Sequence, residues 1–401
     1  MSIAIIESGD YKHEIVISTS IDVGQMDKRS EMPVLKFTLT VLAVAGCWRP
    51  TSWTSLSRNI IYNAYSAFVI LTLYAFSMSQ FVELVLNSDD AETFGDALFN
   101  IMISLLACYK TIVMRLNHES ITMLVNSFTE TPFKPLDLNE SIIRQKFDKR
   151  ITNNTLHYLI LIFVTALYMF VLSLFTNFKD GLLMYKAWIP FDYSISVLFC
   201  LVYGHQILSI IFIGLVHPTT DSFICGLLLH ACCQIEILEY RLSNIAYGRG
   251  NLRDCVRHHV GIYEYAHILN EKFAKIVPSE FTMIIVVMCY NLIHMALTSS
   301  STMFIQDLMF VTSTLAAIFY YCWFGNETKL KSLQLSKNIY NMEWTFLDIN
   351  IKKGLLMIMN RATIPIEFSS ANIMPMNLES FLMVLKTSYS LFNVLIQSRK
   401  Q

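Results

Sequence analysis

Charged residues are scarce in this chain, and their scarcity excludes an ordinary soluble domain. Asp, Glu, Lys and Arg make up 15% of the 401 residues, whereas hydrophobic residues make up 54%. A soluble domain carries about a quarter of charged residues. The formal net charge is −1, so bulk charge gives no reason to expect a nucleic-acid partner. The composition therefore predicts a protein of the lipid bilayer.

Long apolar runs divide the chain into seven predicted membrane spans. A helix needs about 20 apolar residues to cross a bilayer. The segment from Met1 to Glu31 is mixed and acidic rather than a cleavable signal peptide, so we expect the first span to act as a signal anchor. The predicted fold class is an all-α membrane protein with seven transmembrane helices, at about residues 60–82, 95–115, 156–178, 195–217, 276–298, 303–324 and 376–397.

Lys and Arg are nearly absent from alternate connections between these spans. Asn87–Phe94 and Ser299–Asp307 contain none, and Thr176–Tyr193 contains two. The other connections are rich in basic residues, with six in each of 115–150, 241–275 and 329–361. Basic connections stay cytoplasmic, so the N-terminus is predicted inside and the C-terminus outside. A G-protein-coupled receptor needs the reverse orientation and is disfavoured.

Motifs of an enzyme, a metal centre or a nucleotide site are missing. His118-Glu119 has no second His at the spacing of a zinc protease, and Gly248–Gly250 lacks the third Gly of a nucleotide loop. None of the nine cysteines falls in a predicted outside connection, which argues against a disulfide framework. Cys232-Cys233 has no second pair at ligand spacing, which favours helix packing over a metal. We expect no enzyme activity, no cofactor and no metal.

Several helices are predicted to continue past the membrane as cytoplasmic extensions. Ser222 to Leu238 is apolar enough to suggest an eighth span, but charged residues bound it at both ends. We therefore interpret it as a continuation of the fourth helix, bent near Pro218. Helical patterns also lead into the fifth span at 252–275 and continue the sixth as far as about Trp344.

These extensions lie in the second of two predicted parts of the chain. A cytoplasmic tail covers residues 1–35, and one seven-helix domain covers 36–401. Within that domain a cytoplasmic anchor covers about 218–275 and 325–372, ahead of a last helix at about 376–397. Two interpretations of the anchor stay open: it joins subunits, or it packs only within one chain.

The last predicted span carries a polar stripe. Lys386, Ser390, Asn393 and Gln397 recur at spacings of four, three and four, which places them on one helix face, with Val394 beside them. A polar stripe in a membrane helix faces protein or water rather than lipid. The stripe either lines a pore, in which Val394 could supply an apolar gate, or bonds within its own bundle.

Aromatic and Met side chains gather in the outer halves of the second, third, fourth and sixth spans. Such a lining suits a small volatile ligand held mainly by apolar contact, with ordinary bundle packing as the alternative for each residue. Of the ionisable residues near the spans, Lys110 is expected to snorkel to the inner interface and Asp307 to mark an outer boundary. The candidate ligand-binding residues are Phe99, Met102, Ile103, Thr165, Tyr168, Leu172, Phe199, Tyr203, Met309 and Phe310.

An ordered set of stretches resembles the insect odorant receptor family, in particular its hymenopteran members. The resemblance runs from about residue 36 to the end and is strongest after 252. The stretches that carry it are Tyr320–Glu327, the Ser-Leu-Gln-Leu run through Trp344, Ile364–Ser370 and Ser388–Leu395.

This resemblance implies an odorant receptor in the plasma membrane of olfactory sensory neurons. It implies a non-selective cation channel of four subunits, opened by a volatile ligand and lined by the last helix. Arg241–Arg257 lacks the long insertion of the family's co-receptor, so the chain resembles a tuning subunit that forms a heterotetramer with that co-receptor. By position in the terminal motif, Val394 corresponds to the gate, with Gln397 and Ser398 outside it. The alternatives are a gustatory-type receptor and a receptor that signals without its own pore.

Overall fold

The fold of this chain is almost wholly helical in the part that the structure describes. The structure is a computed structural model, and the predicted tail lies outside its described residues except for Leu35. The strands β1 (Ser369–Ser370) and β2 (Met374–Pro375) form one short antiparallel pair. The described residues are 35–50, 53, 55–87, 91–193, 195–273, 275–344, 346–370 and 374–399.

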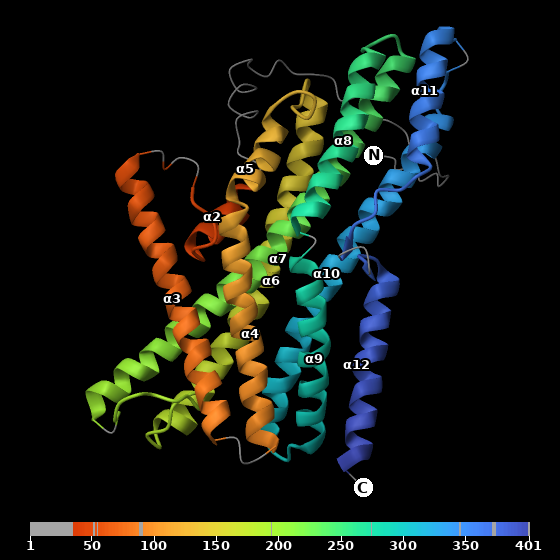
Figure 1. Cartoon of the computed structure of the whole chain (residues 1–401). Coiled ribbons are helices and arrows are strands. Elements are labelled where there is room, and N and C mark those ends of the chain that lie inside the picture. Colours follow the sequence, from red (N-terminus) through yellow and green to blue (C-terminus); the bar gives the residue numbers. More distant parts are fainter. Residues whose placement is uncertain are drawn as a thin grey trace, which may run out of the picture. The chain divides into compact units, whose positions relative to one another are not determined.

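The helices follow one another along the chain as Figure 1 shows. A 3-10 turn, η1 (Ser127–Thr129), follows α5, and a π-helical turn, η2 (Leu174–Phe178), ends α6. The α-helices are α2 (Lys36–Val44), α3 (Leu56–Asn87), α4 (Ala91–Leu116), α5 (His118–Asn126), α6 (Leu138–Ser173), α7 (Ser196–Ala246), α8 (Leu252–Phe273), α9 (Ile276–Leu297), α10 (Ser301–Tyr340), α11 (Ile349–Ala362) and α12 (Leu378–Arg399).

Six helices of the described chain are long and apolar enough to cross a membrane: α3, α4, α6, α7, α9 and α10. They contain the first six predicted spans. The seventh, α12, has 22 residues but is not among the six, because polar residues such as Glu379, Lys386 and Asn393 lower its mean hydropathy. Its assignment as a span stays a prediction.

The predicted helical extensions are present. α7 runs without a break from Ser196 through Pro218 to Ala246, which confirms that 222–238 continues the fourth helix. α10 continues to Tyr340, and α8 and α11 occupy the expected segments. The third predicted span also extends, since α6 already begins at Leu138. Its first turn is capped reciprocally: Asp137 accepts from the Glu140 N–H, and the Glu140 carboxylate accepts from the Leu136 N–H.

α7 forms the centre of the helical packing. It contacts α2, α3, α4, α6, α8 and α10. Its middle is buried on every side, from Val216 through Leu242, with few half-buried positions between. A helix that is apolar all round belongs in a core, which explains why 222–238 reads like a membrane span although it is covered by protein.

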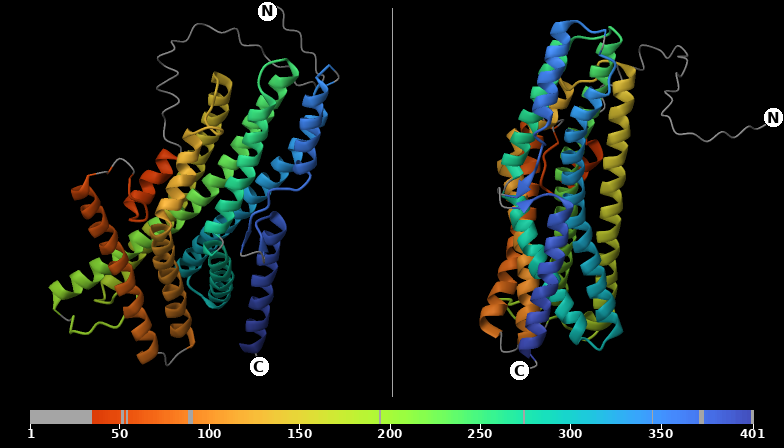
Figure 2. Two further views of the ribbon diagram at one scale, coloured as in Figure 1. Left: turned by 45° about the horizontal axis from the view of Figure 1, so that its top comes forward. Right: turned by 90° about the vertical axis from the view of Figure 1, so that its right-hand side faces the viewer.

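The connections alternate between the two ends of the helices. In Figures 1 and 2 the C-terminal end of α12 lies at the same end as the α6–α7 and α9–α10 connections, while the start of α8 and the whole of α11 lie at the opposite end. The connections poor in Lys and Arg therefore share one end with the C-terminus. This is the arrangement that the charge pattern requires, and the orientation in the bilayer stays a prediction.

Candidate functional site

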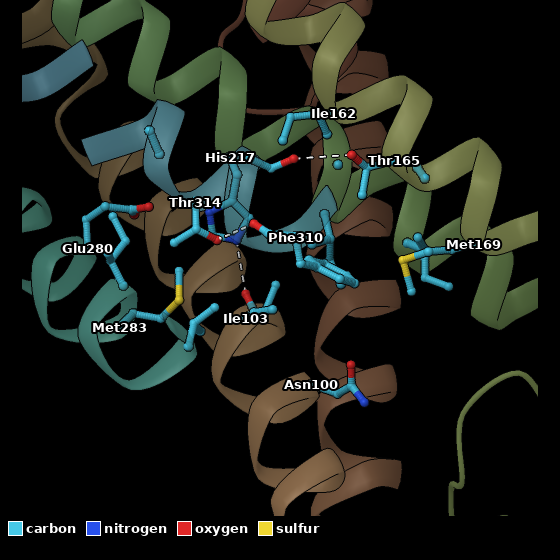
Figure 3. Close-up of a pocket in the computed structure, with 18 of the residues that line it drawn as sticks. Asn100, Ile103, Ile162, Thr165, Met169, His217, Glu280, Met283, Phe310 and Thr314 are labelled. Atoms are coloured by element: carbon cyan, nitrogen blue, oxygen red, sulfur yellow. Dashed lines mark hydrogen bonds between the residues drawn. The ribbon is translucent and has the colours of Figure 1, made fainter. Parts of the chain in front are cut away.

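A cavity lies between α4, α6, α7, α9 and α10, with a volume of about 150 Å³ (Figure 3). A cavity of about this volume accepts a molecule the size of benzene. Its apolar walls include Ile103, Ile162, Ile213, Met283 and Phe310. The polar side chains on its lining are Asn100, Tyr158, Thr165, Tyr185, His217, Glu280, Ser313 and Thr314.

Three of the ten predicted ligand-binding residues line this cavity: Ile103, Thr165 and Phe310. The Thr165 hydroxyl lies 3.2 Å from that of Ser313 and donates to the carbonyl of Leu161, 3.0 Å away. Two more pack just behind the wall, where the Phe99 ring lies 5.4 Å from that of Phe310 and Met102 joins the same apolar cluster.

The other five predicted residues lie outside the cavity lining. The Tyr168 hydroxyl donates to the carbonyl of Thr302 at 3.0 Å. The hydroxyl of Tyr203 lies 2.9 Å from that of Ser173, and its ring packs against Phe199. The hydroxyls and rings of these residues therefore bond and pack against other parts of the bundle. Neither Leu172 nor Met309 is part of the lining.

The cavity lies deeper between the helices than the outer level predicted from aromatic content. Its lining includes residues between Ile210 and His217 of α7 and between Glu280 and Val287 of α9. No residue of α9 was among the predicted ligand-binding residues. His217 and Glu280 are polar residues within apolar segments, a pattern that by itself marks functional positions. That signal could have located the cavity.

A buried charge cluster adjoins the cavity, and its member Glu280 is part of the lining. Lys110 Nζ lies 2.6 Å from Asp221 Oδ1 and 2.5 Å from Glu280 Oε2, and all three side chains are at most 3% exposed. The prediction that Lys110 snorkels to the interface is wrong, because two carboxylates from α7 and α9 hold its ammonium inside. Asp221 also accepts from the Tyr321 hydroxyl at 2.7 Å.

Asp307 lies near the start of α10, where a boundary residue was expected, and it is paired with a side chain of α9. It is 4% exposed, and its Oδ2 lies 2.6 Å from Nδ1 of His294 on α9. The pair joins the C-terminal end of α9 to the N-terminal end of α10.

α12 presents its polar stripe away from its own chain. It packs mainly on α9 and α10 through a face that contains Ser380, Val384 and Ser388, all at most 1% exposed. The stripe lies on the other side of the helix: Lys386, Ser390 and Gln397 are exposed, Asn393 is half-buried, and Val394 is 62% exposed. The side chain of Ser398 lies outside the described part. Within the described chain the stripe therefore does not bond inside its own bundle.

The anchor contains a buried polar network around Arg241. Its guanidinium donates to both carboxylate oxygens of Glu140, at 2.8 and 2.7 Å, and to the backbone carbonyls of Pro132 and Lys134. It also contacts His258, whose other ring nitrogen lies 2.8 Å from the Gln234 side chain. Burial, with Arg241 nearby, lowers the pKa of His258 to about 3.

Comparison with known proteins decides the family. The family model described as 7tm Odorant receptor matches residues 90–389. The chain belongs to the odorant receptor family. It is accordingly a multi-pass membrane protein of a receptor family rather than of an enzyme family, and the family match disfavours the gustatory alternative.

The receptor resembles individual family members only distantly. It is 28% identical to Odorant receptor Or2 of Anopheles gambiae over 188 residues, which are 43% of this chain and 50% of that protein. It is 20% identical to Odorant receptor Or1 of the same species over 401 residues, 89% of this chain and 93% of that one. The chain thus spans about half the length of Or2, the first of these relatives. The hymenopteran resemblance is not supported by these relatives.

A solved structure shares the fold. The receptor matches the insect olfactory receptor OR5 from Machilis hrabei in complex with eugenol, with a TM-score of 0.79 and 18% identity over 91% of this chain and 97% of that one. At this identity the likeness establishes the fold. It confirms an all-helical membrane protein with several long apolar helices.

Proposed function

We propose that this odorant receptor is the ligand-detecting subunit of an odour-gated, non-selective cation channel, assembled with the family's co-receptor in the plasma membrane of olfactory sensory neurons. The ligand is a small volatile held in the cavity of about 150 Å³ between α4, α6, α7, α9 and α10. The OR5 structure in complex with eugenol supports a small volatile as the kind of ligand. Orientation is as the charge pattern predicts, with the C-terminus outside.

The placement of α12 carries this proposal. α9 and α10 form two walls of the cavity, and α12 packs on the same two helices. A ligand that shifts either wall therefore acts directly on the support of α12. The polar stripe on the far side of α12 then faces the ion pathway, where neighbouring subunits meet, and a polar stripe needs such a wet surrounding.

Lys386 explains the need for a second kind of subunit. Four identical lysines around one axis repel one another and the permeating cations, whereas one among four is tolerable. We therefore expect little odour-evoked current from this chain alone and robust current when the co-receptor is present. Robust current from the chain expressed alone contradicts the mixed channel.

A matched pair of serines tests the pore. Ser390 is exposed within the stripe, and Ser388 is buried on the packed face, two residues away. With co-receptor present, a cationic thiol reagent applied outside should block odour-evoked current in Ser390→Cys and leave Ser388→Cys and wild type unchanged. Equal insensitivity of both variants at normal surface amounts argues for the remaining alternative, a receptor without its own pore.

A further inference from the structure

The hydrogen bonds around Lys110 determine the proton on His217. A lysine ammonium has three donors and no acceptor. Lys110 Nζ meets Asp221 Oδ1, Glu280 Oε2 and His217 Nδ1 at 2.6, 2.5 and 3.2 Å, so each donor has one acceptor. Nδ1 of His217 is then an acceptor, and Nε2 carries the proton and donates to the Ile103 carbonyl at 3.1 Å. The His217 ring in this arrangement is neutral.

The two carboxylates of this cluster differ in how completely they are satisfied. Asp221 accepts from Lys110 and from the hydroxyls of Tyr321 and Tyr158, at 2.6, 2.7 and 3.5 Å. Glu280 is 2% exposed and lines the cavity, and its polar contact is the ion pair of its Oε2 with Lys110 Nζ at 2.5 Å. Among the described residues no second donor contacts the Glu280 carboxylate, whereas Asp221 has three. Its unused acceptor sites therefore belong to the cavity.

The charges of the cluster do not balance. Two carboxylates face one ammonium, and the neutral His217 ring adds no charge. With both carboxylates ionised, one negative charge is left beside the cavity, and an uncompensated buried charge is strongly unfavourable. A cation that enters the cavity and donates to Glu280 supplies a second donor to this carboxylate and balances the charge.

We propose that the cavity selects small amines, with the protonated nitrogen beside Glu280 and a compact apolar body against Ile103, Met283 and Phe310. Figure 3 shows Glu280 and His217 among the side chains around the pocket, with these apolar groups nearby. The volume of about 150 Å³ suits one ring or a short aliphatic chain. The proposal rests on the proposed function, since it names the chemical class that this site detects.

Two trios of matched volatiles test it on cells that express the receptor with its co-receptor. The probes are benzylamine, benzyl alcohol and toluene, and hexylamine, hexanol and hexane. The wild type should respond to an amine at concentrations about tenfold or more below those of the matched alcohol, the difference that one charged hydrogen bond supplies. The hydrocarbon should be the weakest of each trio.

Glu280→Gln assigns the preference to this carboxylate. The amide keeps the shape and removes the charge, and Lys110 keeps Asp221 as its partner. We expect amine potency to fall about tenfold or more, while alcohol and hydrocarbon responses change by less than about threefold. Glu271→Gln is the control, since the Glu271 side chain is 63% exposed on α8, and it should match the wild type.

A second variant guards against a folding defect. If Glu280→Gln does not reach the surface, Glu280→Asp decides, because it keeps the charge and withdraws it by one methylene. It should retain the preference for amines at lower potency, and wild-type potency overturns the proposal. An unchanged amine-to-alcohol ratio in Glu280→Gln overturns it as well.

The results that would contradict the proposed function differ from those that would contradict the amine inference. Currents evoked by alcohols or hydrocarbons but by no amine overturn the amine inference and leave an odour-gated channel in place. No current to any volatile, with both subunits at the surface, counts against the channel itself and against the inference that rests on it.

Discussion

Lys110 and Asp221 are 111 residues apart in sequence, yet Nζ and Oδ1 lie 2.6 Å apart with both side chains fully enclosed. The pair joins α4 to the middle of α7, at the level where α7 passes from the predicted span into its extension. A buried ion pair contributes little net stability compared with apolar packing, but breaking it leaves a charge without compensation. It therefore fixes how the two helices meet.

Replacing Lys110 tests this relationship. Lys110→Met leaves Asp221 and Glu280 facing each other, at an expected cost of about 3–5 kcal/mol. Surface protein and the unfolding temperature in detergent should both fall sharply. Lys146→Met is the control, because the Lys146 side chain is 75% exposed and lies 3.9 Å from Glu236, and exposed pairs contribute about 0–1 kcal/mol. Equal stability of the two variants would show that the buried ammonium is dispensable.

The charge pattern and helical periodicity predicted most of the fold. Apolar length located six spans, and the bounding charges of 222–238 identified the continuation of α7 correctly. Those signals are local, because each depends on residues within a few turns. One of the stretches that carried the family resemblance also bonds to other helices: the Tyr321 hydroxyl donates to Asp221, and Glu327 accepts two hydrogen bonds from Arg150, at 2.6 and 2.7 Å.

The cavity was harder to predict, because a cavity depends on which faces meet. Ile103 and Tyr168 look equally suitable by composition, but one lines the cavity and the other bonds the Thr302 carbonyl. Likewise the partners of Lys110 come from α7 and α9, and no spacing along the chain indicates that three such distant residues converge. Pairing of this kind follows from tertiary packing alone.

Acid should destabilise the anchor through His258. The pKa of His258 is lowered to about 3 by burial and by Arg241, against about 6.5 in an unfolded chain. Between these values the unfolded state binds a proton that the folded state does not. The free energy of unfolding therefore falls as the pH drops below about 6.5, by at most about 1.4 kcal/mol per unit.

Unfolding temperatures at pH 7.5 and pH 5.0 check this expectation. His258→Gln removes the titrating group, so its loss of stability between the two pH values should be smaller than that of the wild type. His267→Gln, at an exposed position of α8, should keep the wild-type loss. Identical losses in all three proteins would exclude His258 as a source of the acid sensitivity.

Gly325 should be required for coupling between α10 and α12. A Cβ at this position would overlap the carbonyl oxygen of Met376, in the segment that leads into α12. Gly325→Ala should push that segment away at a cost of about 1–3 kcal/mol and reduce odour-evoked current per surface receptor. Gly204→Ala, where a Cβ meets nothing within 4 Å, should behave as wild type. Normal current from Gly325→Ala would show that the close approach is not needed for gating.

Substitution by serine at two valines of α12 should affect two different properties, the current without odour at Val394 and the amount of surface protein at Val384. Val384 is 1% exposed on the face packed on α9 and α10, whereas Val394 is 62% exposed beside the polar stripe. An apolar ring in a narrow pore resists wetting and blocks ions without a physical plug. Val394→Ser should therefore raise current without odour or alter ion selectivity at normal surface amounts, with a partial effect because co-receptor subunits keep their own gate residues. Val384→Ser should instead lower surface protein, since it places a hydroxyl in a packed apolar contact.

Whole-cell current without odour, normalised to surface protein, and reversal potentials in different cations separate the two outcomes. Unchanged baseline and selectivity in Val394→Ser would remove this residue from the gate.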